Sequence, residues 1–369
     1  MSCMNVIFFV GSFLGMIGLS SYVVFRVGYT IGLLRGTGAT VAIVLMIFLP
    51  LSLVLTMLIS RTHFHPIIQY LYIPGTVWLP YLLYLFLGSV VVGILYFIST
   101  AYSLSLPTRE IGLGIFVLVS ILIGYGLWNT QNPKVITYEI NSPALKENWS
   151  GKTIVLVADT HLGIIWREKF MSKVVSLINS QNPDLVLLPG DIIDGPLFPY
   201  EKGLAPLSGV ASTFGTVFTP GNHEGYTSQQ KAFYSIISQF TTTLIDQTKD
   251  INNTQIIGLD YVAQESREEI LARLDMAGFK KEMPSIALIH DPKNSHYLQD
   301  AGVSLTVSGH THCGQFWPVS AIVKKMYGEY THGVVEKNGN IHITTCGIGT
   351  AMSPVRIGTS AEIVVIKIQ

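Results

Sequence analysis

Four long, uncharged apolar stretches dominate the first third of the chain. They cover residues 4–25, 37–60, 76–100 and 111–128. A helix needs about 20 apolar residues to cross the hydrocarbon core of a bilayer, so each stretch predicts a membrane-spanning helix. Buried core helices are the alternative, but four such runs would need a very large soluble core to hide them. The pattern therefore predicts a transmembrane region over residues 1–128, in contact with a lipid bilayer.

Two features of this region test the interpretation. The first stretch could be a signal peptide, but it lacks a basic n-region and a clear cleavage site, and its apolar run exceeds about 15 residues. Orientation is not decided by the positive-inside rule, because basic residues are balanced on the two sides of the predicted spans. One side holds Arg61, Lys134 and Lys146, and the other holds Arg26, Arg35 and Arg109. The side on which the rest of the chain lies stays open.

A different pattern follows a polar segment, residues 129–150, which reads as a linker. Short apolar, β-branched runs predict buried strands. These runs cover residues 153–158, 184–188, 216–219, 285–289, 305–308, 341–345 and 362–368. Helical spacing appears at residues 168–180, 229–239 and 267–277. Strands that alternate with helices early and crowd together late indicate a layered α/β domain over residues 151–369.

Charge and cysteine content narrow the class of protein. Charged residues make up 12% of the chain, about half of the roughly 25% usual in soluble domains. The shortage lies in the apolar third, while the net charge is zero and no basic stripe suggests nucleic-acid binding. The three cysteines are too few and too scattered for a disulfide framework or a CxxC zinc site. Cys313 could pair with Cys346, but the sequence leaves that open.

Side chains typical of metal ligands follow five of the predicted strands. In chain order these are Asp159 and His161; Asp191; Asn222, His223 and Glu224; His290; and His310 and His312. Loops at the ends of parallel strands converge at one edge of a sheet, which would bring these side chains together. Each fragment alone is weak evidence, but their ordered recurrence predicts a metal site. Oxygen and nitrogen donors of this kind suit Mn, Fe or Zn.

The ordered series DTH, GD, GNHE, H and GHTH resembles the signature of calcineurin-like metallophosphoesterases. The resemblance covers about residues 153–369. The stretches GHTHCGQFWP at 309–318 and TCGIGTAMSPVRI at 345–357 resemble the membrane-anchored bacterial branch of that family. The resemblance implies a four-layer αββα sandwich after the four-helix transmembrane region, in a multi-pass protein of a bacterial plasma membrane. Cys313 stands where a glycine is common.

The resemblance also implies two divalent metal ions that share one ligand. One ion would be held by Asp159, His161, Asp191 and His312. The other would be held by Asp191, Asn222, His290 and His310. Two ions about 3.5–4 Å apart need a shared anion, and the carboxylate of Asp191 can serve both. Such a pair lowers the pKa of a bridging water and so generates a hydroxide nucleophile.

Three further residues receive roles from the resemblance or from their chemistry. His223 is expected to be a general acid toward the leaving oxygen or an electrostatic clamp on the phosphoryl group. Glu224 is a candidate for orienting that imidazole, with a solvated turn residue as the alternative. Arg356 is a candidate for contact with a substrate phosphate, with a strand-end arginine as the alternative.

The resulting hypothesis is a hydrolase of phosphodiester or phosphomonoester bonds. The membrane region suggests a lipid-linked or envelope substrate. The alternative is a non-catalytic membrane sensor or scaffold that binds a phosphorylated ligand, and the intact ligand set with His223 favours the enzyme. The predicted spans contain no charge that would mark a transport path. The choice between ester types depends on loops 195–209 and 317–333, whose shape the sequence does not show.

Overall fold

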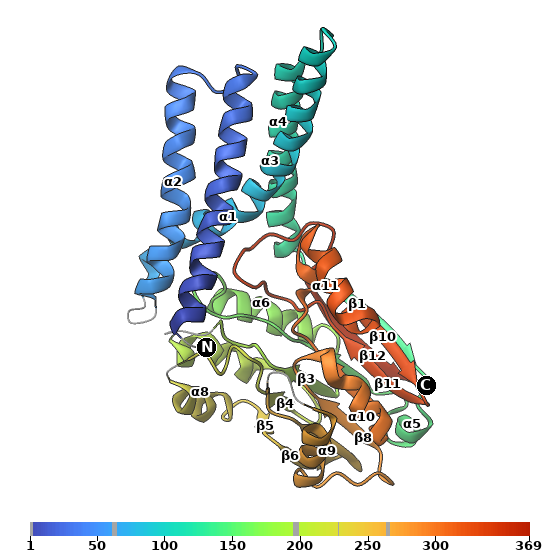
Figure 1. Ribbon diagram of the computed structural model, residues 1–369. Helices are drawn as coiled ribbons and strands as arrows, with labels where there is room; N and C mark the ends of the chain where they lie inside the picture. The colour runs from blue at the N-terminus through green and yellow to red at the C-terminus, as the bar shows by residue number, and fades with distance from the viewer. Residues whose placement is uncertain (1–2, 61–64, 195–198, 228, 263–265) are drawn as a thin grey trace. The chain divides into compact units, whose positions relative to one another are not determined.

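The computed structural model describes residues 3–60, 65–194, 199–227, 229–262 and 266–369, and it divides into two compact units (Figure 1). The helical unit covers the described residues up to Ile59 and from His65 to Trp128, and the α/β unit comprises Ser60 and residues 129–369. Arg61, used above in the charge balance, and part of the loop 195–209 lie outside the described residues.

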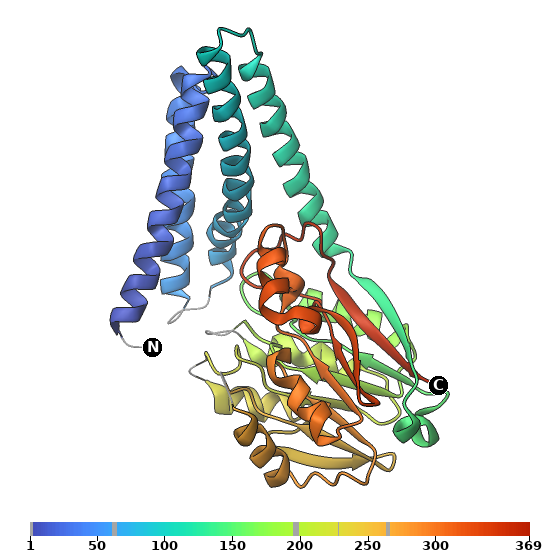
Figure 2. The same cartoon turned by 45° about the vertical axis from the view of Figure 1, so that its right-hand side comes forward.

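The helical unit is built from long apolar helices that lie side by side (Figure 2). They are α1 (Cys3–Thr30), α2 (Gly36–Ile59), α3 (Gln69–Ala101) and α4 (Thr108–Gln131), with the short helix η1 (Pro66–Ile68) before α3. Among the described residues these four are long and apolar enough to cross a membrane. Many of their large apolar side chains are exposed, as a lipid-facing surface requires. The predicted four-helix region is confirmed.

The α/β unit contains two six-stranded sheets. The first has the order β1 (Lys134–Ile140), β12 (Glu362–Ile368), β2 (Thr153–Leu156), β3 (Leu185–Pro189), β4 (Thr216–Thr219), β5 (Thr242–Thr243). The second has the order β10 (Gly333–Lys337), β11 (Asn340–Thr344), β9 (Leu305–Ser308), β8 (Ser285–Leu288), β7 (Thr254–Gly258), β6 (Gln247–Ile251).

Helices cover the outer faces of the two sheets. Apolar residues such as Leu156, Leu187 and Ile286 pack between the sheets. Met171 of α6 (Glu168–Asn179) belongs to an outer cluster on the first sheet, and Ile270 of α9 (Arg267–Met276) to one on the second. These four layers confirm the predicted αββα sandwich. The helices are α5 (Pro143–Trp149), α6 (Glu168–Asn179), α7 (Tyr200–Leu204), α8 (Gln230–Ile237), α9 (Arg267–Met276), α10 (Ser295–Ala301) and α11 (Val319–Tyr327). Short turns of 3₁₀ helix are η2 (Ala205–Gly209), η3 (Pro292–Asn294), η4 (His312–Gly314) and η5 (Gly328–Thr331).

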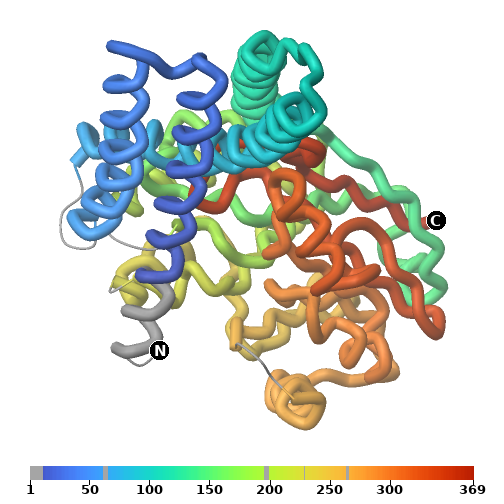
Figure 3. Tube along the Cα trace, turned by 45° about the horizontal axis from the view of Figure 1, so that its top comes forward, coloured from blue at the N-terminus to red at the C-terminus, as the bar shows by residue number. Residues whose placement is uncertain are grey.

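The segment 129–150, expected to be a linker, is instead part of the sandwich. Its strand β1 pairs in parallel with β12, from Lys134 opposite Glu362 to Ile140 opposite Ile368, and the two traces run together (Figure 3). Trp149 of α5 is fully buried and donates its indole N–H to the hydroxyl of Thr254 at 2.8 Å. The local pattern does not reveal this strand, because the strand with which it pairs among the described residues lies more than 200 residues away.

Candidate metal centre

The predicted ligands follow strands whose carboxyl ends share an edge. Strands β2, β3 and β4 are parallel neighbours, and so are β7, β8 and β9. The loops after β2, β3 and β4 provide Asp159, His161, Asp191 and Asn222, and those after β8 and β9 provide His290, His310 and His312. The structure brings all seven side chains together.

A first group of donors gathers around His161. Its Nε2 lies 3.0 Å from Nε2 of His312 and 3.9 Å from Oδ1 of Asp159. The Nε2 atom of His312 is 3.7 Å from the same Asp159 oxygen. Two imidazole nitrogens at such a short separation, with a carboxylate oxygen beside them, can share one cation.

A second group gathers around His290. Its Nε2 lies 3.1 Å from Oδ2 of Asp191, 3.1 Å from Oδ1 of Asn222 and 3.1 Å from Nδ1 of His310. The same Asp191 oxygen is 3.7 Å from Nε2 of His161 in the first group. Asp191 is therefore placed between the two groups, as the shared anion of a metal pair must be.

The backbone at these positions is held in unusual conformations. Asp159, His161, Asp191, His310 and His312 have φ angles of 58°, 47°, 52°, 70° and 46°. Left-handed backbone is uncommon for residues other than glycine, and it persists where the surrounding structure imposes it, often at functional sites. The tight turns bring ligands from adjacent loops into range of one another.

Glycines allow two of these loops to touch. Gly190 has a φ of 84°, and a Cβ atom there would lie 2.5 Å from the backbone nitrogen of Gly221. A Cβ on Gly221 would in turn collide with the Asp191 carboxylate. Only glycine fits at either position, which explains why a glycine precedes Asp191 and Asn222 in the chain.

Hydrogen bonds behind the ligands orient the donor atoms inward. His290 donates from Nδ1 to the carbonyl of Pro189 at 2.8 Å, which leaves Nε2 for a metal. His161 Nδ1 lies 3.2 Å from Oδ1 of Asp194. The Oδ1 atom of Asp191 accepts the backbone N–H of His223 at 2.8 Å, so that Oδ2 is the oxygen that faces both groups. Such outer partners fix ligand orientation at metal sites.

Glu224 occupies a different place from the one expected. It is fully buried, and its carboxylate accepts the backbone N–H groups of Asp191 (2.9 Å), Ile192 (2.8 Å), Ile193 (3.2 Å) and Gly221 (2.7 Å). It therefore ties the loop after β3 to the loop after β4, rather than contacting the His223 imidazole.

His223 has Asp194 as its carboxylate neighbour instead. Its Nδ1 lies 3.4 Å from Oδ1 of Asp194, and its Nε2 lies 3.9 Å from Oδ2 of Asp191. The side chain is 21% exposed, so it can meet a ligand. Burial, and then the nearby His161, lower the pKa of His223. In the sequence, the one signal for Asp194 is that it is a second acid three residues after Asp191.

Arg356 lies behind the ligand His312, with a guanidinium nitrogen 3.4 Å from Nδ1 of that histidine, and is not open to a substrate phosphate. Its side chain is 0% exposed. The guanidinium donates to the backbone carbonyls of His312 (3.0 Å), Cys346 (2.7 Å) and Gly349 (2.8 Å). This placement favours a structural role, because a substrate cannot reach a fully buried group that is already bonded to the backbone.

The charges of the cluster fit divalent cations. Burial, and then the neighbouring Asp191, raise the pKa of Asp159 to about 6, although nearby histidines act in the opposite direction. Burial opposes the charged form of His290 as well, but the Asp191 carboxylate outweighs it and raises the pKa of His290 to about 10. Carboxylates and imidazoles thus share protons at a place where metal ions would bind. Two carboxylates, four imidazoles and one amide oxygen suit Mn, Fe or Zn.

Comparisons with known proteins agree with this chemistry. Residues 152–314 match the calcineurin-like phosphoesterase family. An uncharacterized metallophosphoesterase of Helicobacter pylori (strain J99) is 29% identical over 276 residues, which are 71% of this chain and 73% of that protein.

Two further relatives extend the likeness to other organisms. A Danio rerio protein described as a transmembrane protein with metallophosphoesterase domain is 27% identical, over 67% of this chain and 60% of that protein. An uncharacterized metallophosphoesterase of Bacillus subtilis is 29% identical, over 67% of this chain and 90% of that protein.

Proposed function

We propose that this chain, whose residues 152–314 match the calcineurin-like phosphoesterase family, is a metal-dependent phosphoesterase that hydrolyses phosphate monoesters or diesters at a dinuclear centre. The observation that carries this proposal is the position of Asp191 Oδ2, 3.1 Å from His290 Nε2 and 3.7 Å from His161 Nε2. Asp159, His161, Asp191 and His312 hold one ion. Asp191, Asn222, His290 and His310 hold the other.

Two divalent ions in these positions supply an activated water and neutralise the charge on phosphoryl oxygens. The donor set, rich in imidazole, points to Mn, Fe or Zn. The residues of the chain do the rest: the left-handed turns and the outer hydrogen bonds hold the donors in place before the substrate arrives.

His223 is the proposed general acid. Its Nδ1 faces Asp194, so Nε2 is the nitrogen that points toward the ligand cluster. A protonated imidazole in that position can transfer its proton to the oxygen of the departing alcohol. Asp194 is the proposed positioning residue, because its carboxylate contacts both His223 and the ligand His161.

The helical unit supports the proposal that the substrate is linked to a lipid. Four helices able to cross a membrane keep the α/β unit at a bilayer surface. A phosphate ester whose alcohol part is embedded in that bilayer would be supplied at high local concentration. A bacterial plasma membrane is the proposed location.

The test uses the full chain, purified in detergent. Hydrolysis of bis-p-nitrophenyl phosphate and of p-nitrophenyl phosphate is measured with Mn²⁺, with a chelator, and in the Asp191→Ala variant. The matched control is Asp250→Ala, since Asp250 is exposed on β6. We expect turnover that needs the metal and falls by more than about 100-fold in Asp191→Ala, with the control unchanged.

A second arm presents phosphatidic acid in mixed micelles beside a short-chain, water-soluble analogue. Preference for the long-chain lipid supports the lipid-linked substrate, whereas equal rates argue against it. If the metal is bound but none of these esters is hydrolysed with Mn, Fe or Zn, the enzyme proposal fails in favour of a sensor that binds a phosphorylated ligand.

A further inference from the structure

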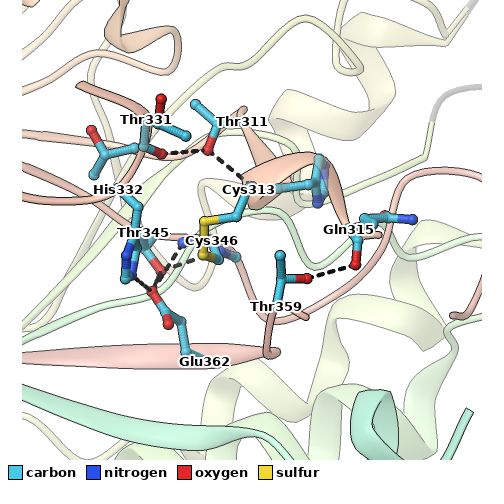
Figure 4. Close-up of a disulfide and its surroundings, with 12 residues drawn as sticks. Thr311, Cys313, Gln315, Thr331, His332, Thr345, Cys346, Thr359 and Glu362 are labelled. Carbon is cyan, nitrogen blue, oxygen red and sulfur yellow. Dashed lines mark hydrogen bonds and ion pairs between the residues drawn. A yellow bond between two sulfur atoms is a disulfide. The ribbon is translucent and has the colours of Figure 1, made fainter. Parts of the chain in front are cut away.

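Two cysteines lie next to each other beside the metal-ligand cluster but are not members of it. Cys313 follows the ligand His312 in η4, and Cys346 lies just beyond β11. Their Cα atoms are 5.1 Å apart and their sulfurs are joined in a disulfide (Figure 4). Both residues are buried. The proposed metal pair uses neither sulfur.

A histidine completes a group of three soft or borderline donors. Donor atoms of Cys313, Cys346 and His332 all lie within 4.8 Å of one another. These residues come from three separate segments of the chain, so their meeting is a result of the fold. Thiolate and imidazole are the donors that zinc prefers in proteins.

Glu362 holds His332 in the manner of an outer partner at a metal site. Its Oε1 accepts a hydrogen bond from Nε2 of His332 at 2.9 Å. The same oxygen accepts the hydroxyl of Thr345 at 3.1 Å and the backbone N–H of Cys346 at 3.0 Å. A metal-bound histidine commonly bonds a carboxylate through the ring nitrogen that the metal does not use. In a zinc-bound state Glu362 would take one ring nitrogen of His332 and the metal the other.

The group opens onto a cavity of about 700 Å³. Cys313, His332, Cys346 and Glu362 all line it, together with Lys324 and Glu329. The His332 side chain is 37% exposed. An ion therefore has an entry path, and a water molecule has room to take the fourth position that tetrahedral zinc requires.

We propose that Cys313, Cys346 and His332 form a zinc site that is separate from the dinuclear centre and is opened by reduction of the disulfide. A dithiol reductant, R(SH)₂, transfers two hydrogens with two electrons to the Cys313–Cys346 bond. The products are two cysteine thiols and the cyclic disulfide of the reductant. Zinc then binds both sulfurs and His332, and the two thiol protons are released to solvent.

The spacing of the main chain accommodates both states. Two thiolates on a tetrahedral zinc, each about 2.3 Å from the metal, have sulfurs about 3.8 Å apart. Once the disulfide is broken, rotation of the two side chains can provide that separation across a Cα distance of 5.1 Å.

The experiment uses the full chain in detergent, in the Asp191→Ala background, so that metal at the dinuclear centre is suppressed. Oxidised protein and protein treated anaerobically with dithiothreitol, then freed of it, receive Co²⁺ as a spectroscopic probe for zinc. Thiolate ligation gives a sulfur-to-cobalt charge-transfer band that the oxygen and nitrogen donors of the dinuclear centre cannot give. Zinc bound to each form is counted with a competing chromophoric chelator.

We expect the band, and about one equivalent of bound zinc, only in the reduced protein. His332→Ala, which leaves both cysteines and the disulfide in place, should lower zinc affinity by at least about 10-fold. His296→Ala, a half-buried histidine on α10, is the matched control and should bind as the parent does.

The proposal fails if reduced protein shows no charge-transfer band, or if His332→Ala binds zinc as tightly as the control. It also fails if the oxidised form binds the same amount of zinc. These results are independent of turnover, because the Asp191→Ala background is inactive if the proposed function is right and still reports on the thiols if it is wrong.

Discussion

The buried carboxylate of Glu224 offers the sharpest test of how the fold positions the metal ligands. Replacing it with glutamine keeps the size of the side chain but exchanges one oxygen for an NH₂ group. Each carboxylate oxygen now accepts two backbone N–H groups: Oε1 those of Ile192 and Ile193, and Oε2 those of Asp191 and Gly221. In Glu224→Gln, one of these pairs must face a donor.

The cost follows from those two lost bonds. A buried N–H without an acceptor costs about 1–3 kcal/mol, so the variant should lose roughly 2–6 kcal/mol of stability. For a domain of this size, about 2–4 °C of melting temperature corresponds to each kcal/mol, which gives a shift of about 10 °C. The loop that holds Asp191 should also loosen, so that more Mn²⁺ is needed for half-maximal activity.

The assay is thermal unfolding of the metal-free full chain in detergent, followed by fluorescence of the buried Trp149 and Trp166 of the α/β unit. Burial, and then the Asp191 carboxylate, raise the pKa of Glu224 to about 7, so the measurement is made near pH 8, where the side chain is mostly ionised. Glu282→Gln, at an exposed position, is the matched control. A melting temperature in Glu224→Gln within a degree of the control's would refute the reasoning.

Three further outcomes are expected. His223→Asn should lower kcat by about 100-fold or more with metal content unchanged, and the loss should be larger for alkyl esters than for p-nitrophenyl esters, whose leaving group needs no proton; equal losses would contradict a general acid. Arg356→Lys loses several hydrogen bonds to buried carbonyls, so it should destabilise the α/β unit by roughly 3–5 kcal/mol in thermal unfolding and leave KM for the ester unchanged, whereas a raised KM in a stable variant would restore a substrate contact. Burial lowers the pKa of His342 to about 3. Below the usual pKa of histidine, the unfolded chain therefore binds a proton that the folded chain does not, and the stability decreases as the pH is lowered. Between about pH 7 and pH 5 the wild type should lose roughly 2 kcal/mol more than His342→Gln, and parallel losses in denaturant unfolding of the two would argue against it.

Local sequence patterns determine a large part of this protein. Four apolar runs free of charge predict membrane-spanning helices, because burying all of them in a soluble protein would need a very large core. In the α/β unit, short β-branched runs mark strands, and the glycine, aspartate and histidine residues after them mark the loops at one sheet edge. These signals are local, since a strand end and the residue beyond it are neighbours in the chain.

Contacts between distant segments required the tertiary structure. The segment 129–150 is ambiguous by itself, because β1 becomes a strand only beside β12. From the sequence, Glu224 is a candidate partner for the adjacent His223. In the fold its carboxylate instead accepts backbone N–H groups that include the one of Asp191, more than 30 residues earlier in the chain. Arg356 carries the charge of a phosphate ligand, and only its burial among carbonyls shows a structural role.

The cysteines show the same division. From the sequence, Cys313 and Cys346 were two thiols 33 residues apart, with pairing left open. The fold places them together with His332 and the buried Glu362 on one cavity. The residue types and the ends of the strands can be recognised from the sequence. Which side chains meet depends on how the two sheets pack. That packing is the sum of many weak contacts across the whole domain, and no short stretch of sequence contains them.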